Sequence, residues 1–376
     1  MQINNNIKEQ PANISPDNFD RGLIRLLRWV LIFITLFVAT FFVTGWGIYR
    51  LNWQNSFSNS VARVIPYPAA IVNYTNWISF NDYNQNIQSI RKYLESKEAA
   101  YKGSGFDFST DEGLKRLAII KKNVLNQLIE NRIIRILAEK RGIKVSDAEL
   151  SDTTNKILAR DNQEKENLTQ LSLLYGWGSD DFQKRVVKDL LYRDKLEEYV
   201  KNQGELDKNA KVKLQTVLDK IKNGEDFAEV AKEFSESPSK EYGGLLPAFT
   251  KEEAPENFAN VAFSIPVGKI SDPIEGTDGW HIVKIEKKFE EGGKTKVELR
   301  NIFINRDTLD DWLKNQKKQF RVYVPLSDYF WHPEMGRLYF KDESLNQLEE
   351  KINRATIDEK LQEADFLLNV SKPLSK

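Results

Sequence analysis

Residues 222–249 read KNGEDFAEVAKEFSESPSKEYGGLLPAF, and residues 256–286 read ENFANVAFSIPVGKISDPIEGTDGWHIVKIE. These two stretches decide the fold of the second half of the chain. Gly224 predicts the end of a helix that begins near Lys211, because glycine adopts the left-handed conformation that often ends helices. Gly243 and Gly244 predict a tight turn at positive φ. The stretches therefore indicate helices joined by short turns.

A strand is expected at the end of the second stretch. Trp280, Ile282 and Ile285 alternate imperfectly with polar residues, which is typical of a strand in an antiparallel sheet. A scaffold role explains this alternation but gives no reason for a histidine, His281, inside the strand. A core histidine with satisfied hydrogen bonds and a functional histidine both remain open.

Together the two stretches resemble the parvulin-type (rotamase, PpiC-type) peptidyl-prolyl isomerase domain. The matching positions are Gly224, Phe227, Ala231, Ser235, Gly243, Gly244, Leu246, Phe249, Phe258, Ala262, Phe263, Gly268, Ile270, Ser271, Pro273, Gly279 and His281. The resemblance implies that Phe249 and Phe258 form the walls of a proline pocket and that His281 belongs to a polar cluster beside it. It implies no cofactor and no metal.

The sequence departs from the parvulin pattern in three places. Ala254 stands where the family usually has methionine or leucine, which predicts a shallower substrate pocket. Ser237 replaces an acidic or cysteine residue in the catalytic cluster. The opening strand of the family is absent before Val212, where residues 201–210 are polar.

A candidate for the absent strand lies downstream. Residues 296–305, KVELRNIFIN, have a strand-like apolar pattern, and Asn301 stands where the catalytic cluster of the family has a histidine. The segment EEGG, 290–293, predicts a hairpin loop that joins this strand to the strand of His281. This order resembles a circular permutation of the parvulin fold, since a sheet without the strand would expose its pairing edges. The alternative is that residues 297–304 continue into another module.

Near the N-terminus, residues 29–49 read WVLIFITLFVATFFVTGWGIY and carry no charge. At about 1.5 Å per residue, a helix of this length crosses a hydrocarbon layer of about 30 Å. A cleaved signal peptide is the alternative, although its apolar core is usually shorter. Arginines are more frequent before the apolar run than after it, which predicts a cytoplasmic N-terminus and an extracytoplasmic body.

The region between the apolar run and residue 205 is expected to be mainly helical. A strand or hairpin is expected over 60–80, a helix from Ser79 or Asn81, and a long helix over 114–140. Ser146 and Glu149 form a capping box, and Ser179 opens a further helix. The whole pattern, including AEKRGIKVSDAEL and YGWGSDDF, resembles the N-terminal region of SurA-like and PrsA-like foldases; any helical domain is the alternative.

The composition excludes several classes of function. Lys plus Arg equals Asp plus Glu at 55 each, so no basic surface favours nucleic acid. Without cysteine, the chain has no disulfides and no thiolate chemistry. With two histidines, a histidine-based metal site is not expected.

The sequence therefore predicts an α+β protein, possibly permuted in its parvulin-like part. The expected regions are a cytoplasmic tail (1–28), a transmembrane helix (29–50), a SurA/PrsA-like helical domain (51–205), a parvulin-like domain (206–306) and a C-terminal helix and strand extension (307–376). The expected function is that of a single-pass, membrane-anchored extracytoplasmic foldase that isomerises X-Pro bonds in unfolded exported polypeptides. The alternative is a non-catalytic peptide-binding chaperone or scaffold with a degenerate parvulin domain. The expected partners are such polypeptides and the lipid bilayer.

Overall fold

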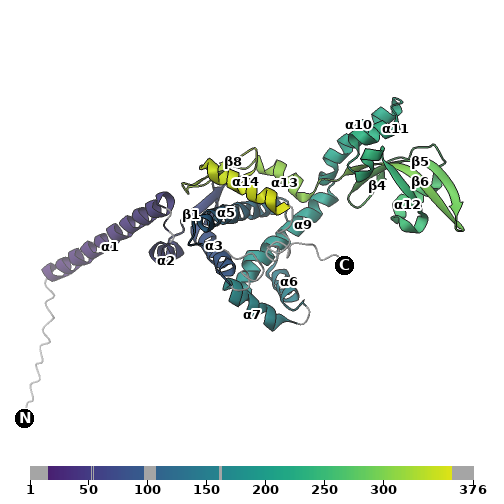
Figure 1. Cartoon of the computed structure of the whole chain (residues 1–376). Helices are drawn as coiled ribbons and strands as arrows, with labels where there is room; N and C mark the ends of the chain where they lie inside the picture. Colours follow the sequence, from purple (N-terminus) through teal and green to yellow (C-terminus); the bar gives the residue numbers. More distant parts are fainter. Residues whose placement is uncertain (1–15, 52, 54, 97–106, 161–162, 358–376) are drawn as a thin grey trace, which may run out of the picture.

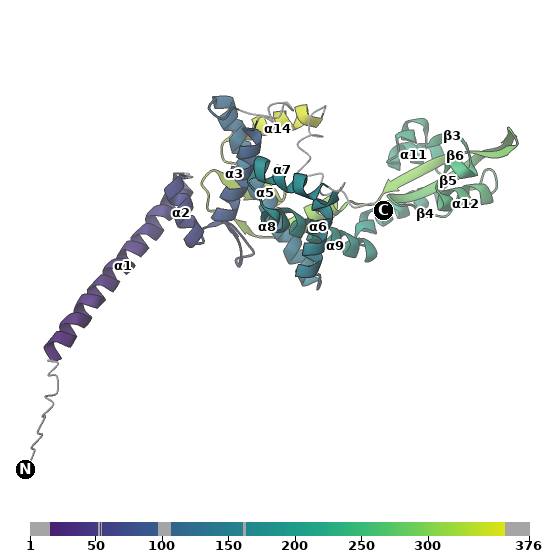
Figure 2. The same ribbon diagram turned by 90° about the horizontal axis from the view of Figure 1, so that it is seen from below.

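The structure, a computed structural model, describes residues 16–51, 53, 55–96, 107–160 and 163–357. A long N-terminal helix, α1 (Pro16–Arg50), projects from a first, mainly helical body. A second body with a twisted sheet lies at the opposite end, beyond α9 and α10 (Figure 1). Figure 2, a view turned by 90°, shows the same order of helix, first body and second body.

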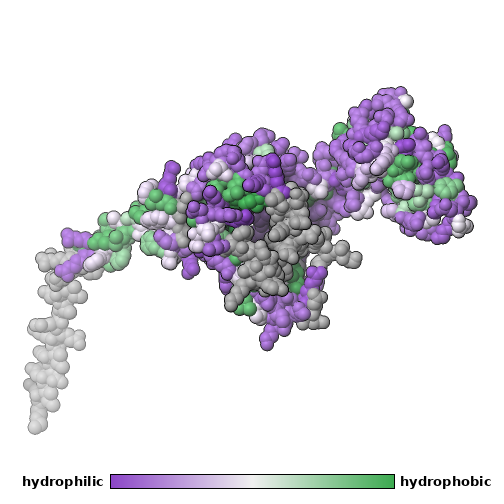
Figure 3. Space-filling view, in the orientation of Figure 1, coloured by the Kyte–Doolittle hydropathy of each residue, from purple (hydrophilic) through white to green (hydrophobic). Residues whose placement is uncertain are grey.

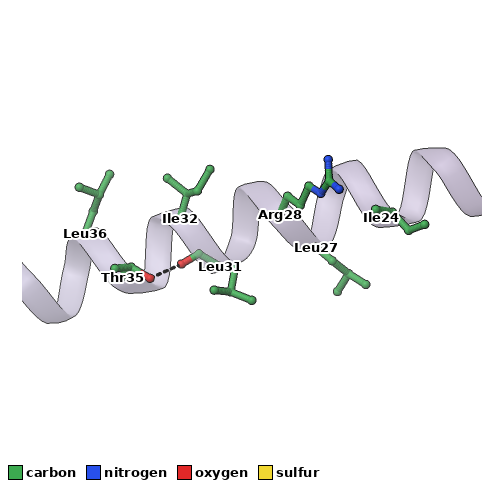
Figure 4. A pocket seen from close by; sticks show the side chains of 7 residues that line it. All are labelled: Ile24, Leu27, Arg28, Leu31, Ile32, Thr35 and Leu36. Carbon is green, nitrogen blue, oxygen red and sulfur yellow. Dashed lines mark hydrogen bonds between the residues drawn. The ribbon is translucent and has the colours of Figure 1, made fainter.

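Within the described residues, α1 is the one helix long and apolar enough to cross a membrane, over Leu23–Arg50. Its apolar side chains, among them Leu27, Leu31 and Leu36, project to several sides (Figure 4). The hydroxyl of Thr35 donates to the Leu31 carbonyl at 2.8 Å, which satisfies this polar group within the helix (Figure 4). Helix α1 thus suggests a membrane span.

The N-terminal part of the first body contains helices around one small hairpin. Its elements are α2 (Ser56–Val64), β1 (Pro68–Val72), β2 (Asn76–Ser79), α3 (Phe80–Leu94), α5 (Asp111–Lys140), α6 (Asp147–Leu158), α7 (Glu164–Tyr175), α8 (Ser179–Phe182), a π-helical turn (Gln183–Val187) and α9 (Lys188–Asn202). Helix α5 packs against α9 and β1.

The hairpin predicted within residues 60–80 is confirmed by β1 and β2, but its first part is wrong. Residues 56–64 form helix α2 instead of a strand. The side chain of Asn55 caps this helix by accepting the Ser58 N–H at 2.9 Å. Ser58 and Ala62, one turn apart, are buried against the body, so capping and packing override the β-branched composition.

The other helices predicted for this region are confirmed. Helix α3 begins after Ser79, whose side chain accepts the Asp82 N–H as an N-cap. Helix α5 covers the predicted 114–140, and Ser146 caps α6. The helix at Ser179 also forms, with Gly178 as its N-cap, and it continues through the π-helical turn into α9.

The C-terminal segment returns to the first body. It contains α13 (Leu309–Lys317), β7 (Val322–Tyr323), β8 (Tyr329–His332), β9 (Arg337–Phe340) and α14 (Glu343–Ile357). Strand β7 pairs with β1, and Leu313 and Phe320 lie in the same apolar core as Leu125 and Ile133. Lys122 on α5 forms a buried ion pair with Glu349 on α14. The last part of the extension expected over 307–376, residues 358–376, lies outside the described residues.

The second body is one continuous stretch of chain. It consists of α10 (Lys208–Lys222), α11 (Phe227–Phe234), β3 (Leu245–Thr250), α12 (Glu256–Ser264), β4 (Ile274–Glu275), β5 (Gly279–Glu291) and β6 (Lys294–Asn305). The sheet is antiparallel with the order β3-β6-β5-β4. The predicted strand KVELRNIFIN is therefore confirmed as β6, an inner strand of the sheet. The mixed helix and antiparallel-sheet class is confirmed as well.

The two bodies meet where the chain enters and leaves the second one. The Asp307 N–H donates to the Leu206 carbonyl at 3.1 Å. Asp207, nearly buried, accepts from Arg306 Nε at 2.6 Å and from Trp280 Nε1 at 3.3 Å. The domain limits expected from the sequence stay a prediction, but these bonds place residues 206 and 307 side by side.

Candidate functional site

His281 on β5 and Asn301 on β6 lie on one face of the sheet. In the β5–β6 register, His281 is opposite Phe303 and Val283 is opposite Asn301, so His281 and Asn301 are diagonal neighbours. Their side chains meet, with 3.1 Å between His281 Nδ1 and Asn301 Oδ1. The predicted proximity of the two residues is confirmed; their catalytic role stays a prediction.

The environment of His281 favours a neutral imidazole. Burial lowers the pKa of His281 below its ordinary value, and the hydrogen bond to Asn301 raises it by less. Because an amide oxygen only accepts, Asn301 Oδ1 holds the proton on Nδ1 and leaves Nε2 as an acceptor. Gly276 lies against this second nitrogen, since a Cβ added there would be 3.2 Å from His281 Nε2.

Aromatic rings surround the imidazole and continue as an apolar wall. Phe258 meets His281 edge-on with 5.1 Å between ring centroids, and Phe303 stacks on its other side at 4.6 Å. The ring centroid of Phe249 lies 6.1 Å from that of Phe258 and 6.0 Å from that of Phe263. These rings form an apolar surface beside one polar pair, and edge-on and stacked contacts of this kind fix ring orientation.

The two predicted proline-pocket phenylalanines are thus brought together, and Ala254 lies near them. Phe258 is buried, whereas Phe249 and Ala254 are half-buried and pack against the same apolar cluster. The alanine methyl contributes little wall at the position where a methionine would extend over the surface. The depth of the proline pocket stays a prediction.

Ser237 has a local role in the structure. Its side chain accepts the Ser239 N–H at 3.3 Å and lies 3.0 Å from the Ser239 hydroxyl, so it caps the 3-10 turn Pro238–Tyr242. Both hydrogen bonds remain within that turn. Its catalytic role stays a prediction.

Two further residues, Ser235 and Phe303, support the site, and the sequence did not indicate a role for either. The Ser235 hydroxyl, almost fully buried, accepts the Phe303 N–H at 3.1 Å and so links the end of α11 to β6. Phe303 stands two positions after Asn301, so strand alternation could have placed its ring on the same face. Ser235 is a matching position of the parvulin pattern, which gives no hint of its hydrogen bond.

The double glycine allows β3 to approach β6 next to Asn301. Gly244 has φ +79° and accepts the Asn301 N–H at 2.8 Å through its carbonyl. A Cβ at Gly244 would be 2.6 Å from the Asn301 carbonyl oxygen, so a side chain there would push the strands apart. The glycine therefore positions the asparagine backbone.

Arg306 holds the loop that contains Gly276. Its guanidinium donates to Glu275 Oε1 at 2.6 Å and to the Thr277 carbonyl at 3.0 Å, and also binds Asp207. Residues on both sides of Gly276 are thereby tied to the junction of the bodies. Among the residues that the structure describes, no group of three or more His, Cys, Asp or Glu could hold a metal ion.

Two domain families match the sequence. The PPIC-type PPIase domain (Rotamase) matches residues 195–287, and the SurA-like N-terminal domain matches residues 24–197. The first match ends before β6, the strand that contains Asn301.

Two proteins with similar sequences are a foldase and a chaperone by name. Foldase protein PrsA of Caldanaerobacter subterraneus subsp. tengcongensis is 28% identical over 298 residues, which are 76% of this chain and 89% of the relative. Chaperone SurA of Legionella pneumophila is 25% identical over 232 residues, 50% of this chain and 54% of the relative, so the match spans about half of SurA.

A crystal structure of a peptidylprolyl isomerase (PrsA) from Bacillus anthracis aligns with 61% of this chain and 96% of that chain, at 20% identity and a TM-score of 0.19. By its domain matches and its relatives, the chain is PrsA- and SurA-like: residues 24–197 match a SurA-like N-terminal domain, and residues 195–287 match a PPIC-type PPIase domain.

Proposed function

We propose that this protein is a membrane-anchored, extracytoplasmic foldase that catalyses cis-trans isomerisation of X-Pro bonds in unfolded exported polypeptides. The observation that supports this proposal is the His281–Asn301 pair set against the ring of Phe258 and continued by Phe249. The names of the relatives, foldase and chaperone, agree with it.

The reaction requires rotation about an amide and no covalent chemistry. Its uncatalysed barrier is about 18–20 kcal/mol because amide resonance keeps the bond planar. A twisted amide loses this resonance, so its carbonyl oxygen becomes a weaker hydrogen-bond acceptor and its nitrogen becomes a better one. A surface that binds the proline ring and removes water, next to groups that bind the twisted amide better than the planar forms, lowers the barrier.

The residues of the site match these requirements. Phe249 and Phe258 supply an apolar surface for the proline ring, and Ala254 limits its depth. His281 presents a neutral imidazole whose orientation Asn301 fixes. We assign Ser237 to the edge of the cluster, where a hydroxyl is a weaker acceptor than the carboxylate it replaces.

The second candidate function is that of a peptide-binding chaperone or scaffold without isomerase activity. Ala254, Ser237 and Asn301 favour it, because each departs from the parvulin pattern. The first body also has a hollow of ≈ 380 Å³ whose lining mixes apolar side chains, such as Phe80 and Leu117, with charged ones, such as Lys121 and Asp342. A mixed lining of this kind suits an extended peptide segment.

Exchange spectroscopy by NMR on a short X-Pro peptide separates the two functions. The full chain in lipid nanodiscs is the appropriate sample, because Ile48 of α1 is buried in the first body and a truncation would expose it. Faster exchange than with empty nanodiscs supports the enzyme. An unchanged rate, together with binding of a permanently unfolded protein, supports the chaperone.

Orientation requires its own test. A reporter that is active only in the cytoplasm, fused after Lys376, is expected to stay silent, because arginines are enriched on the N-terminal side of α1. Signal from this reporter would contradict the proposed orientation but would not bear on the proposed isomerase activity.

A further inference from the structure

The last turns of α1 are part of the first body. The Tyr67 hydroxyl, just before β1, donates to the Phe41 carbonyl at 2.8 Å, and the two rings stack with 5.4 Å between centroids. Gly45, Gly47 and Ile48 are buried by the body. The helix therefore enters the body directly, without an intervening linker.

The length of the apolar run places this contact within the outer part of a bilayer. A hydrocarbon layer of about 30 Å takes about 20 helical residues, which extends from Arg28 to about Ile48. Phe41 lies seven residues earlier, about 10 Å back along the axis. Moving the helix outward would draw Arg28 and Arg25 into the hydrocarbon, where a charged side chain is strongly disfavoured. Tyr67 then lies within the outer leaflet beside Phe41, and α2, which precedes Tyr67 in the chain, lies near the membrane surface.

Helix α2 precedes Tyr67 and presents an unpartnered apolar face. Ser58 and Ala62 face the body, whereas Phe57 and Val64, seven residues apart and hence on one side, are 55% and 80% exposed. Trp46 on α1 and Leu51 after it are 59% and 48% exposed. Figure 3 shows hydrophobic surface that continues along α1 up to the first body.

The charged residues of the segment that contains α2 are all of one sign. The sequence has 55 acidic residues in 376, yet none between Asp20 and Asp82. The charged residues between Trp46 and Asp82 are Arg50 and Arg63, both exposed. A segment with exposed apolar side chains, arginines and no carboxylate of its own is typical of helices that lie in the headgroup region.

We propose that α2 is an interfacial helix, whose exposed Phe57 and Val64 insert into the outer leaflet and hold the first body on the bilayer surface. The proposal depends on the proposed span of α1 and adds a second lipid contact. Two contacts, the span and α2, fix the tilt and rotation of the body relative to the membrane. A second copy of the chain or a client peptide on this face is the competing occupant.

The lack of cysteine makes the test direct, because each single cysteine can carry one label. Val64→Cys (80% exposed in wild type) and Val212→Cys on α10 (70% exposed) are a matched pair of exposed valines in the first and second bodies. Leu36→Cys, at 58% exposure on α1, reports on the span itself. Each full-length variant is labelled with an environment-sensitive fluorophore in nanodiscs of phosphatidylcholine and phosphatidylglycerol. The fluorescence of the label is then quenched with aqueous acrylamide or with doxyl-labelled lipid.

The label at Val64→Cys is expected to be at least about threefold less accessible to acrylamide than that at Val212→Cys, and to be quenched by lipid. Acrylamide quenching equal to that at Val212→Cys, while Leu36→Cys is quenched by lipid, would overturn the interfacial contact and leave the anchor intact. If Leu36→Cys is itself accessible to acrylamide, the span and the interfacial contact both fail. Protection at Val64→Cys without lipid quenching would indicate a protein occupant and overturn the proposal.

Discussion

The two bodies differ in how the chain builds their cores. The second body uses one continuous stretch, from α10 to β6, within which β5 pairs with its sequence neighbours β4 and β6 and β3 pairs with β6. The first body combines α3 and α5 with residues after Leu309, and its sheet pairs Ile71 with Tyr323. The first body therefore depends on long-range contacts. Substitutions in the first body should change stability, and substitutions at the site in the second body should change catalysis.

The largest effect is expected from Lys122→Met in the first body. Lys122 is 2% exposed and pairs with Glu349 on α14, so its loss leaves a buried carboxylate without a partner. The free energy of unfolding of this body should fall by about 3–5 kcal/mol. Calorimetry should show its transition moving to lower temperature, with that of the second body unchanged.

The double variant Lys122→Met/Glu349→Leu is the control for this prediction. Removing both charges should restore much of the stability, because the lone buried carboxylate is gone. A common shift of both transitions in the single variant would show that the two bodies unfold as one unit, and the comparison would break down.

The next largest effect is expected from Phe258→Ala in the second body. Removing the ring should cost about 1–3 kcal/mol of transition-state binding, or about fivefold to 150-fold in kcat/KM. Rates must be compared at equal folded fraction, since unfolding would imitate a loss of catalysis. Phe320→Ala is the matched control, because Phe320 is a buried phenylalanine of the first body. An equal loss of kcat/KM in both variants would contradict the assignment of Phe258 to the proline site.

The contrast between the bodies also explains what the sequence could predict. In the second body, Gly243 and Gly244 and the alternation of 296–305 are local signals, so the turn, β6 and the neighbourhood of Asn301 were predictable. In the first body, helix caps such as Ser146 were readable. The return of the C-terminal segment was not, because pairing between Ile71 and Tyr323 leaves no trace in either local pattern.

A smaller gain is expected from Ala254→Met. A longer apolar side chain should deepen the proline surface beside Phe249, and isomerisation should become about twofold to tenfold faster for peptides with an apolar residue before proline. Ala254→Ser, which adds no apolar wall, is the matched control. A faster rate in both variants would mean that pocket depth is not the cause.

The smallest effect is a dependence of stability on pH. Burial lowers the pKa of folded His281 below its ordinary value of 6.5, so the unfolded chain binds more protons below that pH. The second body should therefore be fully stable above pH 6.5 and lose stability as pH falls towards the folded pKa.

This dependence is measured by denaturant unfolding at a series of pH values, with His281→Gln as the comparison. Asp194 of the first body has a pKa raised to about 6 by burial, so its titration opposes the effect within the same range. The difference between wild type and His281→Gln isolates the histidine. A pH dependence that persists unchanged in His281→Gln would contradict the neutral buried imidazole.

The adjacent entry and exit of the second body have a consequence for synthesis. Because Asp307 bonds back to Leu206, residues up to 307 are enough to complete the second body. The first body must wait for β7, β8 and β9, which follow later. A chain that emerges N-terminus first, as in cotranslational export, therefore closes its isomerase-like part while the part beside the membrane is still open. The nascent protein is thus expected to present a finished proline site before its own scaffold is complete.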